Sequence, residues 1–506
     1  MEHNGPRDSQ MHVTRLPERD SETSDFEIVI GIVAPIGTDL ESLFFHLQRE
    51  LSPYQYRSHM IRLSRLLDEG VPTDPNTEAN KCIAERLMDR GDDLRQGFKH
   101  GGALAALAIA KIWSIRKKDQ IPIDQSSRVA WILRTLKHEG EVELLRHAYG
   151  SRFVLVGAQQ NESFRQAKLL ADLRDELPGQ RDLESLAAHL ISRDQMDTDN
   201  QYGQQVRDTY SLSDYFINLD ANVEREVERF VGLLFGKPFL TPTRDEQAMF
   251  HAYASAFRSA DPGRQVGAIV TTPAGELLVT GTNEVPRAGG GSYWEDDEDD
   301  KRDFQLGYNF NKRMNHRAMK EFIGYLADNE LLNKELMALP LAQQYEKISS
   351  ADRSGLKRLR LTSLIEFGRV SHAEMSAITQ AARTSLSIDG GTIYSTTYPC
   401  HMCMRLIIAS GIRRVVYIDP YPKSLAEEMY FDSLNKPGGI TVSSFWGASW
   451  TIFTRVFQRI NREEFLEGSY VADKSRMRLA DHDPLAGAVD REVIIHSAIS
   501  SRLDTK

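Results

Sequence analysis

Apolar positions in the first half of the chain alternate between short continuous runs and helical spacing. The run over residues 26–33 predicts a buried strand, and residues 40–51 repeat their apolar positions with the period of an amphipathic helix. Later segments continue this alternation, with a helix expected over 102–115 and strands over 129–136 and 153–157. Strands that alternate with helices are typical of an α/β fold built on a parallel sheet.

The pattern changes between residues 222 and 243, where a polar helix over 225–235 gives way to a proline-containing stretch. We place a domain boundary there. A second set of elements follows, in which charged, helix-forming residues fill an insertion over 309–369. The elements expected around this insertion are a helix over 245–257, a β-hairpin over 264–280, strands over 391–397 and 414–418, and a helix over 402–410.

The loop between the first strand and helix has the layout of a phosphate-binding P-loop, G-x-x-x-x-G-K-[ST]. The match is incomplete, because Ile32 stands at the first glycine position, and Thr38 and Asp39 follow Gly37 where lysine and a hydroxyl belong. An aspartate there repels phosphate unless a cation intervenes. The missing lysine disfavours a working NTPase. Two interpretations stay open: a degenerate regulatory domain that holds an effector nucleotide with Mg²⁺ at these residues, and a plain βα turn.

Basic residues are scattered over the polar helical stretch that follows. They either converge on phosphates, as in nucleotide kinases, or solvate a helix face, as such residues more often do. The residues concerned are Arg165, Lys168, Arg193 and Arg207.

Composition narrows the class of protein. With 506 residues, of which 41% are hydrophobic and 26% charged, the chain suits a globular protein of two or three domains. No apolar run reaches membrane-spanning length and residues 1–24 do not resemble a secretory signal, so we expect a cytoplasmic protein with no membrane partner. Three cysteines give no disulfide framework. A net charge of −10 disfavours a protein whose main task is to grip a polyanionic strand.

Two short motifs carry the candidate chemistry: H-A-E, which begins at His372, and P-C-x-x-C, which contains Cys400 and Cys403. One imidazole and two thiolates make up the three protein ligands of a catalytic zinc site, which leaves its fourth position to water. Zinc lowers the pKa of this water, but an amino leaving group still needs a proton. Glu374 is placed to move that proton. The combination indicates hydrolytic removal of an amino group from a cytosine ring.

The expected elements permit this geometry. Pro399 ends the preceding strand, so Cys400 and Cys403 lie three positions apart in the first turn of a helix and share a face. His372 and Glu374 are only two positions apart, and both reach one water only if their helix points its N-terminal end at the metal.

Each motif alone also has a structural interpretation. Residues 371–374 fit a capping box, and a C-x-x-C pair can be a redox pair or half of a structural zinc site. The third cysteine, Cys82, is remote in the sequence. The H-A-E and P-C-x-x-C motifs occur in the right order, with a strand and a helix between them, and this combination favours the catalytic interpretation.

Residues 258–457 resemble the deoxycytidylate deaminases. Besides the two zinc motifs, the likeness rests on R-Q-V-G-A from Arg264, G-T-N ending at Asn283, and Y-P-K-S-L-A from Tyr421, a string that zinc binding does not require. With the P-loop-like first domain, the chain resembles the bacterial antiphage deoxycytidine-nucleotide deaminases of the AvcD type. The resemblance implies conversion of dCMP or dCTP to a deoxyuridine nucleotide and ammonia, which would deplete deoxycytidine nucleotides during phage infection.

The resemblance also implies roles for substrate-binding residues. Asn283 would hydrogen-bond the sugar, Arg264 would contact phosphate, and Tyr417 would stack on the base; the structural alternatives are an Asx-type turn, a surface arginine and a core aromatic residue. Ser376 stands where deoxycytidylate deaminases commonly have asparagine, so no contact of that amide is carried over. The likeness further implies a homo-oligomer, a hexamer, with a small inhibitory RNA as a candidate partner.

The expected fold is therefore α/β in both domains: a P-loop-like, nucleotide-kinase-like domain followed by a cytidine-deaminase-like three-layer α/β/α domain with a mixed sheet. The expected segments are a disordered arm over 1–24, a degenerate P-loop NTPase-like regulatory domain over 25–235, the zinc-dependent deaminase domain over 236–475 and a C-terminal tail over 476–506.

Two rival functions remain. A polynucleotide deaminase acting on cytosine or adenine in RNA or single-stranded DNA would use the same zinc-site residues, and the acidic net charge and the Y-P-K-S-L-A string disfavour it. A catalytically idle nucleotide- or RNA-sensing protein is the other alternative. The complete ligand set with Glu374 beside it disfavours that interpretation.

Overall fold

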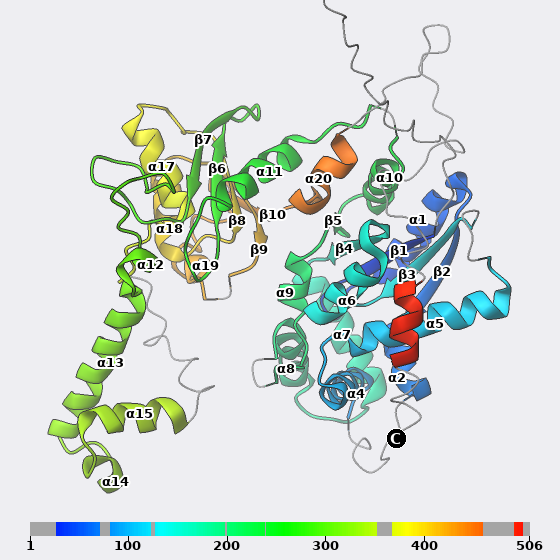
Figure 1. Ribbon diagram of the computed structural model, residues 1–506, viewed down its shortest axis with the longest axis horizontal. Helices are drawn as coiled ribbons and strands as arrows, with labels where there is room; N and C mark the ends of the chain where they lie inside the picture. The colour runs from blue at the N-terminus through cyan, green and yellow to red at the C-terminus, as the bar shows by residue number, and fades with distance from the viewer. Residues whose placement is uncertain are drawn as a thin grey trace, which may run out of the picture.

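Two sheets form the framework of the protein (Figure 1): the second is built from the second half of the chain, and the first from the first half together with one short strand of the second half. The computed structural model describes residues 27–70, 81–122, 127–197, 200–237, 239–351, 367–421, 423–458 and 490–498. The expected arm over 1–24 lies outside this range.

The first sheet has the strand order β11-β5-β4-β1-β3-β2. The five strands from the first half of the chain are parallel, as the alternation of strands and helices predicts. In this sheet only β11 pairs antiparallel. The strands of this sheet are β1 (Ile28–Val33), β2 (Arg57–Arg62), β3 (Val129–Arg134), β4 (Phe153–Gln159), β5 (Tyr215–Asn218) and β11 (Gly447–Ala448).

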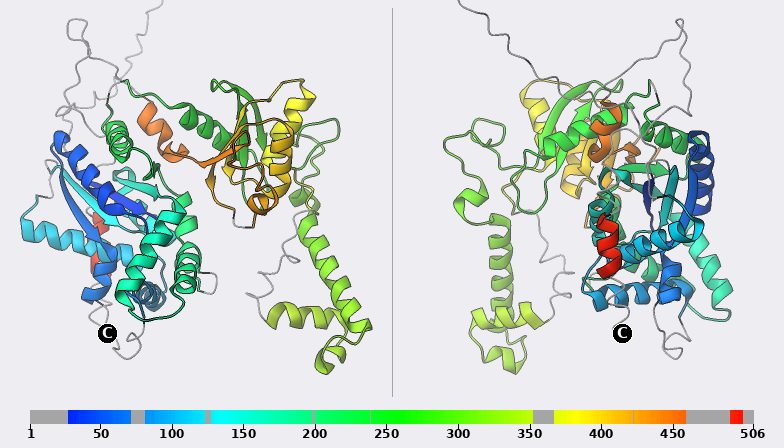
Figure 2. Two further views of the ribbon diagram at one scale, coloured as in Figure 1. Left: turned by 180° about the vertical axis from the view of Figure 1, so that it is seen from behind. Right: turned by 45° about the vertical axis from the view of Figure 1, so that its right-hand side comes forward.

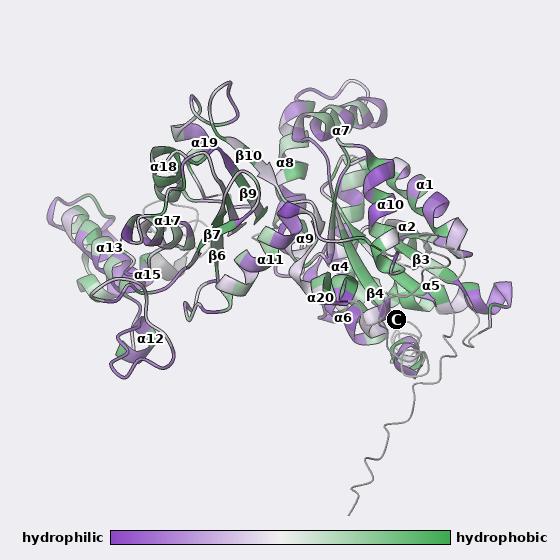
Figure 3. Cartoon of the chain, turned by 90° about the horizontal axis from the view of Figure 1, so that it is seen from above, coloured by the Kyte–Doolittle hydropathy of each residue, from purple (hydrophilic) through white to green (hydrophobic). Residues whose placement is uncertain are grey.

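Helices cover both faces of this first sheet, because β1, β3 and β4 are apolar on both sides and need two covering layers. Figure 3 shows β3 and β4 in green among these helices. The helices are α1 (Leu40–Leu51), α2 (Leu63–Gly70), α4 (Ile83–Phe98), α5 (Ala103–Asp119), α6 (Glu139–Tyr149), α7 (Glu162–Glu176), α8 (Leu183–Gln195), α9 (Val206–Ser211) and α10 (Val223–Leu234), with short 3₁₀ turns at Ser52–Tyr54 and Gly150–Arg152.

The second sheet has the order β10-β9-β8-β6-β7 and is mixed, as expected. The hairpin of β6 (Gly267–Thr271) and β7 (Leu277–Thr282) is antiparallel, and β6 also pairs antiparallel with β8 (Thr392–Thr397). The strands β8, β9 (Arg414–Asp419) and β10 (Thr441–Ser444) run parallel. The carboxyl ends of β8 and β9 therefore lie at the same edge of the sheet.

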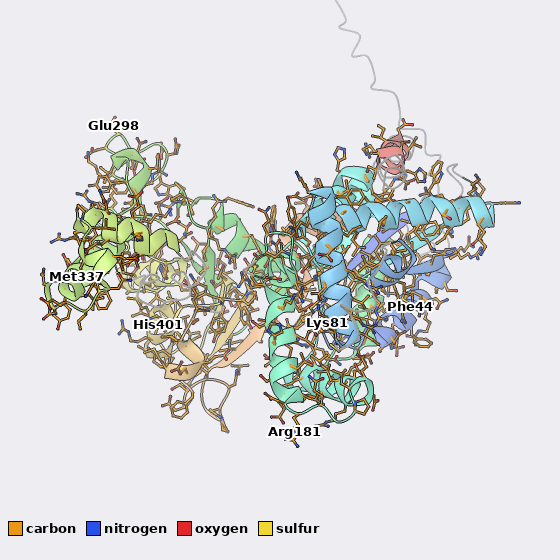
Figure 4. All side chains as sticks on the ribbon, turned by 90° about the horizontal axis from the view of Figure 1, so that it is seen from below. Phe44, Lys81, Arg181, Glu298, Met337 and His401 are labelled. Atoms are coloured by element: carbon orange, nitrogen blue, oxygen red, sulfur yellow. The ribbon has the colours of Figure 1, made fainter. Side chains whose placement is uncertain are left out.

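Helices α11 (Arg244–Ala256) and α17 (Ala373–Arg383) pack on the β6–β7 hairpin. The insertion forms an arm of helices that projects from this half, with Met337 at its outer end (Figures 2 and 4). The remaining helices are α12 (Asp303–Leu306), α13 (Phe310–Asp328), α14 (Lys334–Met337), α15 (Leu341–Ala351), α18 (His401–Ala409), α19 (Ala426–Met429) and α20 (Trp450–Phe457).

The chain returns to its first half after the deaminase-like segment. Strand β11 pairs with β5, and a helix over 490–498 packs beside α5 (Figure 1). The apolar core is also continuous between the halves, since Phe216 of β5 contacts Phe445 edge-on, with ring centroids 5.9 Å apart. The domain limits expected from the sequence remain proposals, and two segments of the second half, β11 and the helix over 490–498, pack on the first half.

Candidate active site

Two helix N-termini and the end of a strand build the candidate metal site. His372 is the N-cap residue of α17, and Cys400 is the N-cap residue of α18. A short connection, which contains Tyr398 and Pro399, joins β8 to α18. Cys403 lies in the first turn of α18, and its backbone N–H donates to the Cys400 sulfur at 3.4 Å. The N-terminal ends of both helices therefore face the same point, which is the orientation that the two-residue spacing of His372 and Glu374 demands.

The three ligand atoms lie close together. His372 Nδ1 is 3.4 Å from Cys400 Sγ and 3.3 Å from Cys403 Sγ, and all three ligand atoms lie within 4.8 Å of one another. Tetrahedral zinc with ordinary bond lengths places a nitrogen and a sulfur ligand about 3.6 Å apart. The donor types and their separations thus fit zinc with small adjustments.

The electrostatics of the site also favour a metal cation. Hydrogen bonds from Cys403 and His372 lower the pKa of Cys400 to about 4, so this sulfur is a thiolate at neutral pH. The N-terminus of α18 adds the positive end of its dipole. A thiolate is the form of cysteine that binds zinc.

Glu374 lies beside the cluster and is 4% exposed. Ser395 of β8 donates a hydrogen bond to its Oε1 at 3.3 Å, so the neighbouring strand orients the carboxylate. Burial raises the pKa of Glu374, and the nearby His372 opposes this only in part. A raised pKa favours the protonated form of this carboxyl group, which is the form that can donate a proton.

One cavity connects these residues to the other candidate site residues. Its volume is about 650 Å³, large enough for a nucleotide, and His372, Glu374 and Cys400 lie in its wall. The rest of the wall comes from the segment before β6, from the segments after β7, β8 and β9, from the region between β7 and α17, and from one residue of the first half. These residues include Asp261, Arg264, Asn283, Asp303, Asn309, Asn311, Lys312, Arg369, Thr397, Tyr421, Lys423 and Arg207.

Asn283 lines the cavity, but its amide is occupied by the backbone. Its Oδ1 accepts from the Val266 N–H at 2.6 Å, and its Nδ2 donates to the Arg264 carbonyl at 2.7 Å. This is the turn-like bonding of the structural alternative, and it fixes the loop that carries Arg264. A contact of Asn283 with a sugar remains a prediction.

Arg264 also lines the cavity, and its Nη1 lies 3.4 Å from Asp419 Oδ2. Half of its side chain is exposed, so it is available to an anionic group. Tyr417 is placed differently, since it packs edge-on against Tyr398, with centroids 4.9 Å apart, and is not among the described residues that line the cavity. This packing corresponds to the core interpretation of Tyr417.

The P-loop-like residues Gly37, Thr38 and Asp39 make contacts within the protein. Gly37 has a φ of +81°, and a Cβ there would lie 2.4 Å from the Arg165 carbonyl oxygen, so the turn requires glycine. Thr38 donates to the Pro35 carbonyl at 2.7 Å, and Asp39 caps α1 by accepting from the Glu41 N–H.

A buried carboxylate lies against the same loop. Asp194 accepts from the Ile36 N–H at 2.7 Å and from Lys137 at 2.7 Å, and Lys137 also donates to the Ala34 carbonyl. A cavity of about 290 Å³ adjoins the loop and is lined by Arg62 and Arg134 among others. A protein carboxylate thus occupies part of the anion-binding surface that a P-loop offers to phosphate. Binding of an effector nucleotide here remains a prediction.

Several cavity residues have no counterpart among the candidates chosen from sequence. Thr397 lies within an ordinary strand pattern, and Asn309 and Lys312 lie in an insertion whose contacts depend on the tertiary fold. Ser395, which bonds to Glu374, lies in the same strand pattern and does not line the cavity. From its sequence, Arg207 either contacts phosphate within the first half or solvates a helix face, and neither alternative places it in this wall.

Comparisons with known proteins agree with this geometry. Residues 242–419 match the family model of the cytidine and deoxycytidylate deaminase zinc-binding region. This segment contains His372, Cys400 and Cys403, the three candidate metal ligands, and Glu374. The second half of the chain thus contains a segment similar to the zinc-binding region of these deaminases.

Two relatives of this segment are deoxycytidylate deaminases of phages. The deoxycytidylate deaminase of Enterobacteria phage T4 is 37% identical over 112 residues, which are 21% of this chain and 52% of that protein. The deoxycytidylate deaminase of Enterobacteria phage T2 is 32% identical over 124 residues, which are 24% of this chain and 64% of that protein. The chain therefore spans about half to two thirds of these curated relatives.

A solved structure, the dCMP deaminase from cyanophage S-TIM5 in apo form, aligns over 41% of this chain and all of its own length, with 18% identity and a TM-score of 0.22. This TM-score is too low to establish a shared fold. Within the described part of the chain, no helix is both long enough and apolar enough to cross a membrane.

Proposed function

We propose that this protein is a zinc-dependent enzyme that removes the amino group of deoxycytidine nucleotides by hydrolysis, with dCMP, dCTP or both as substrates, to give deoxyuridine nucleotides and ammonia. One observation carries the proposal: a His-Cys-Cys cluster lies beside a buried glutamate, and His372, Cys400 and Glu374 line one nucleotide-sized cavity. Deoxycytidylate deaminases among the relatives support the choice of substrate.

The residues of this chain have separable tasks in the reaction. His372, Cys400 and Cys403 would hold zinc, which when bound lowers the pKa of a water ligand towards neutrality. Glu374 takes one proton from the attacking water and delivers it to ring N3, then takes the second proton from the new hydroxyl on C4 and delivers it to the departing amino group, so that one water is consumed and one ammonia released. Ser395 orients the carboxylate throughout.

The physiological role is a further part of the proposal. An enzyme of the antiphage AvcD type would deplete dCTP during infection, act as a homo-oligomer in the cytoplasm, and respond to an inhibitory RNA or to an effector nucleotide at the first domain. The likeness of the sequence motifs supports this role.

A glutamine at position 374 tests the chemistry. E374Q retains the shape of the side chain but cannot carry a proton, so we expect zinc content to stay near one ion per chain while turnover of dCMP and dCTP falls about 10²- to 10⁴-fold. Uracil-nucleotide product is measured by chromatography, and zinc by elemental analysis. Glu321→Gln on the exposed face of α13 is the matched control and should keep full activity.

The same assay separates the rival functions. Purified protein is incubated with dCMP, dCTP, CMP and a cytosine-containing oligonucleotide. Product from the oligonucleotide alone would replace the proposal by polynucleotide deamination, and an E374Q variant that retains turnover would refute the assigned proton transfer. C403S should lose zinc, and this loss would identify the His-Cys-Cys cluster as the metal site.

A further inference from the structure

One basic residue of the first half reaches the cavity of the second. Arg207 lies on α9, outside the segment that matches the deaminase family, yet it lines the same cavity as His372, Glu374 and Cys400. Its charge also acts on the carboxylate of Asp419, the last residue of β9. The first half therefore supplies part of the wall of the candidate active site.

Two neighbouring strands lead into the metal site and into the basic residues of this cavity. Strands β8 and β9 are parallel neighbours, with Thr397 beside Asp419, so the segments that follow them leave from the same edge. Cys400 follows β8 at the metal end. Pro420, Tyr421 and Lys423 follow β9, beside Arg264 and Arg207, at the basic end. A nucleotide with its base at the metal end would extend its phosphates towards the β9 side.

The state of the Arg207 side chain fits a ligand contact. Its Nε donates to Asp208 at 2.9 Å, which orients the guanidinium, and 27% of the side chain is exposed. Within the described residues, its two terminal nitrogens have no protein acceptor among the hydrogen bonds. A guanidinium with both Nη groups available can bind phosphate oxygens in bidentate fashion.

The second half of the chain brings Arg264, Lys312, Arg369 and Lys423 to the cavity wall, with Arg264 near Asp419 and Arg369 paired with Asp303. These cations can balance the charge of a single phosphate group. A further cation contributed by the first half gains most from a longer phosphate chain, since each added phosphate brings further negative charge and further acceptors.

We infer that Arg207 contacts the outer phosphates of a deoxycytidine di- or triphosphate, so that the first half of the chain sets the preference for dCTP over dCMP. This inference rests on the proposed deamination. It makes Arg207 a specificity-determining residue, which lies away from the reacting atoms.

The test compares kcat/KM for dCMP and dCTP in the full-length protein and in R207Q. Loss of one charged contact to phosphate should lower kcat/KM for dCTP about tenfold, while the value for dCMP changes less than about twofold. R207K, which retains the charge without the planar fork, should recover part of the dCTP activity. Arg225→Gln, an exposed arginine on α10 away from the cavity, is the matched control and should leave both values unchanged.

Each other outcome is decisive. A wild-type protein that deaminates neither nucleotide would refute the proposed function. A wild-type protein that deaminates dCMP but not dCTP, or an R207Q variant whose dCTP-to-dCMP ratio stays within twofold of wild type, would overturn the inference and leave deamination intact. Equal losses with both substrates would assign Arg207 a structural role and also overturn it.

Discussion

The carboxylate of Asp245 joins three elements of the second half of the chain. It accepts hydrogen bonds from both Nη atoms of Arg414 on β9, at 2.7 and 2.6 Å, and from the Tyr394 hydroxyl on β8 at 2.7 Å. Burial raises the pKa of Asp245, but these hydrogen bonds and the charge of Arg414 outweigh burial, so the pKa lies below its ordinary value. The ionised carboxylate therefore stabilises the fold.

Replacement of Asp245 by asparagine should lower the free energy of unfolding by about 1 kcal/mol at pH 7, because Arg414 is partly exposed and water screens the pair. A lowered pKa stabilises the fold fully above the unfolded-state value, about 3.9, and this contribution is lost as the pH falls through the folded-state value. The difference between wild type and D245N should therefore shrink below about pH 4. Urea unfolding across pH 3 to 8 measures it.

The exposed pair of Arg317 and Glu321 on α13 provides the control, since both side chains are mostly in solvent. Glu321→Gln should change stability by less than about 0.5 kcal/mol at any pH. A D245N deficit that stays constant down to pH 3 would show that shape rather than charge matters at this position.

Single residues also show what a sequence can reveal about a site. His372, Glu374, Cys400 and Cys403 are predictable because each pair is local, and the spacing within each motif determines which atoms share a helix end. Arg207 reaches the cavity through the packing of two halves of the chain, and no local spacing encodes that contact. Asn283 shows the intermediate case, in which the motif identifies the residue but the tertiary structure determines that its amide bonds to backbone.

Among the elements, the hairpin β6–β7 is the surface on which helices α11 and α17 pack. A Cβ on Gly267 would lie 1.9 Å from the Ala252 carbonyl oxygen of α11, and one on Gly281 would lie 2.1 Å from the Ala373 carbonyl oxygen of α17. These contacts require glycine because of close approach. Helix α17 begins next to His372, so its distance from the sheet positions the metal ligand and Glu374.

Gly281→Ala should push α17 away from β7, lower the free energy of unfolding by about 1–3 kcal/mol and reduce zinc occupancy. Thermal unfolding and elemental analysis measure the two effects. Gly324→Ala on α13 is the control, because its Cβ would meet no atom closer than 3.9 Å. That substitution should be neutral or slightly stabilising through helix propensity. Full zinc occupancy in G281A would show that the metal site tolerates movement of α17.

Strands and helices with strong periodicity are predicted well from this sequence, since burial on a sheet or helix face imposes the pattern directly. The parallel strands of the first sheet and the mixed second sheet are both confirmed. Strand β11 could not be predicted, because two residues carry no periodicity and its pairing with β5 joins positions far apart in the chain. The P-loop-like interpretation of the first domain stays a prediction.

The complete fold depends on a core that both halves share. Phe445 is 1% exposed and packs on Phe216 of β5, while its backbone N–H donates to the Tyr417 carbonyl of β9. Glu246 of α11 adds a polar link, since it accepts from the Ala448 N–H at 2.9 Å and pairs with Arg229 of α10. The two halves are therefore joined by apolar packing and by ion pairs.

We expect wild-type protein to unfold in one calorimetric transition, because neither half has a core of its own at this junction. Phe445→Ala should remove about 3–5 kcal/mol and separate the transition into two. Phe431→Ala, at a side chain that is 69% exposed, is the control and should leave the single transition in place. Two transitions in the wild-type protein would show that the halves unfold independently.

Arg116 on α5 is held by two carboxylates that are distant in the sequence, Glu27 before β1 and Glu492 in the returning helix. During synthesis on the ribosome, Arg116 and Glu27 are made early, whereas β11 and Glu492 appear only after the strands of the second sheet have been translated. A nascent first half therefore exposes one sheet edge and an incomplete buried charge cluster while the second half is being made. Its assembly is completed last, although it is translated first.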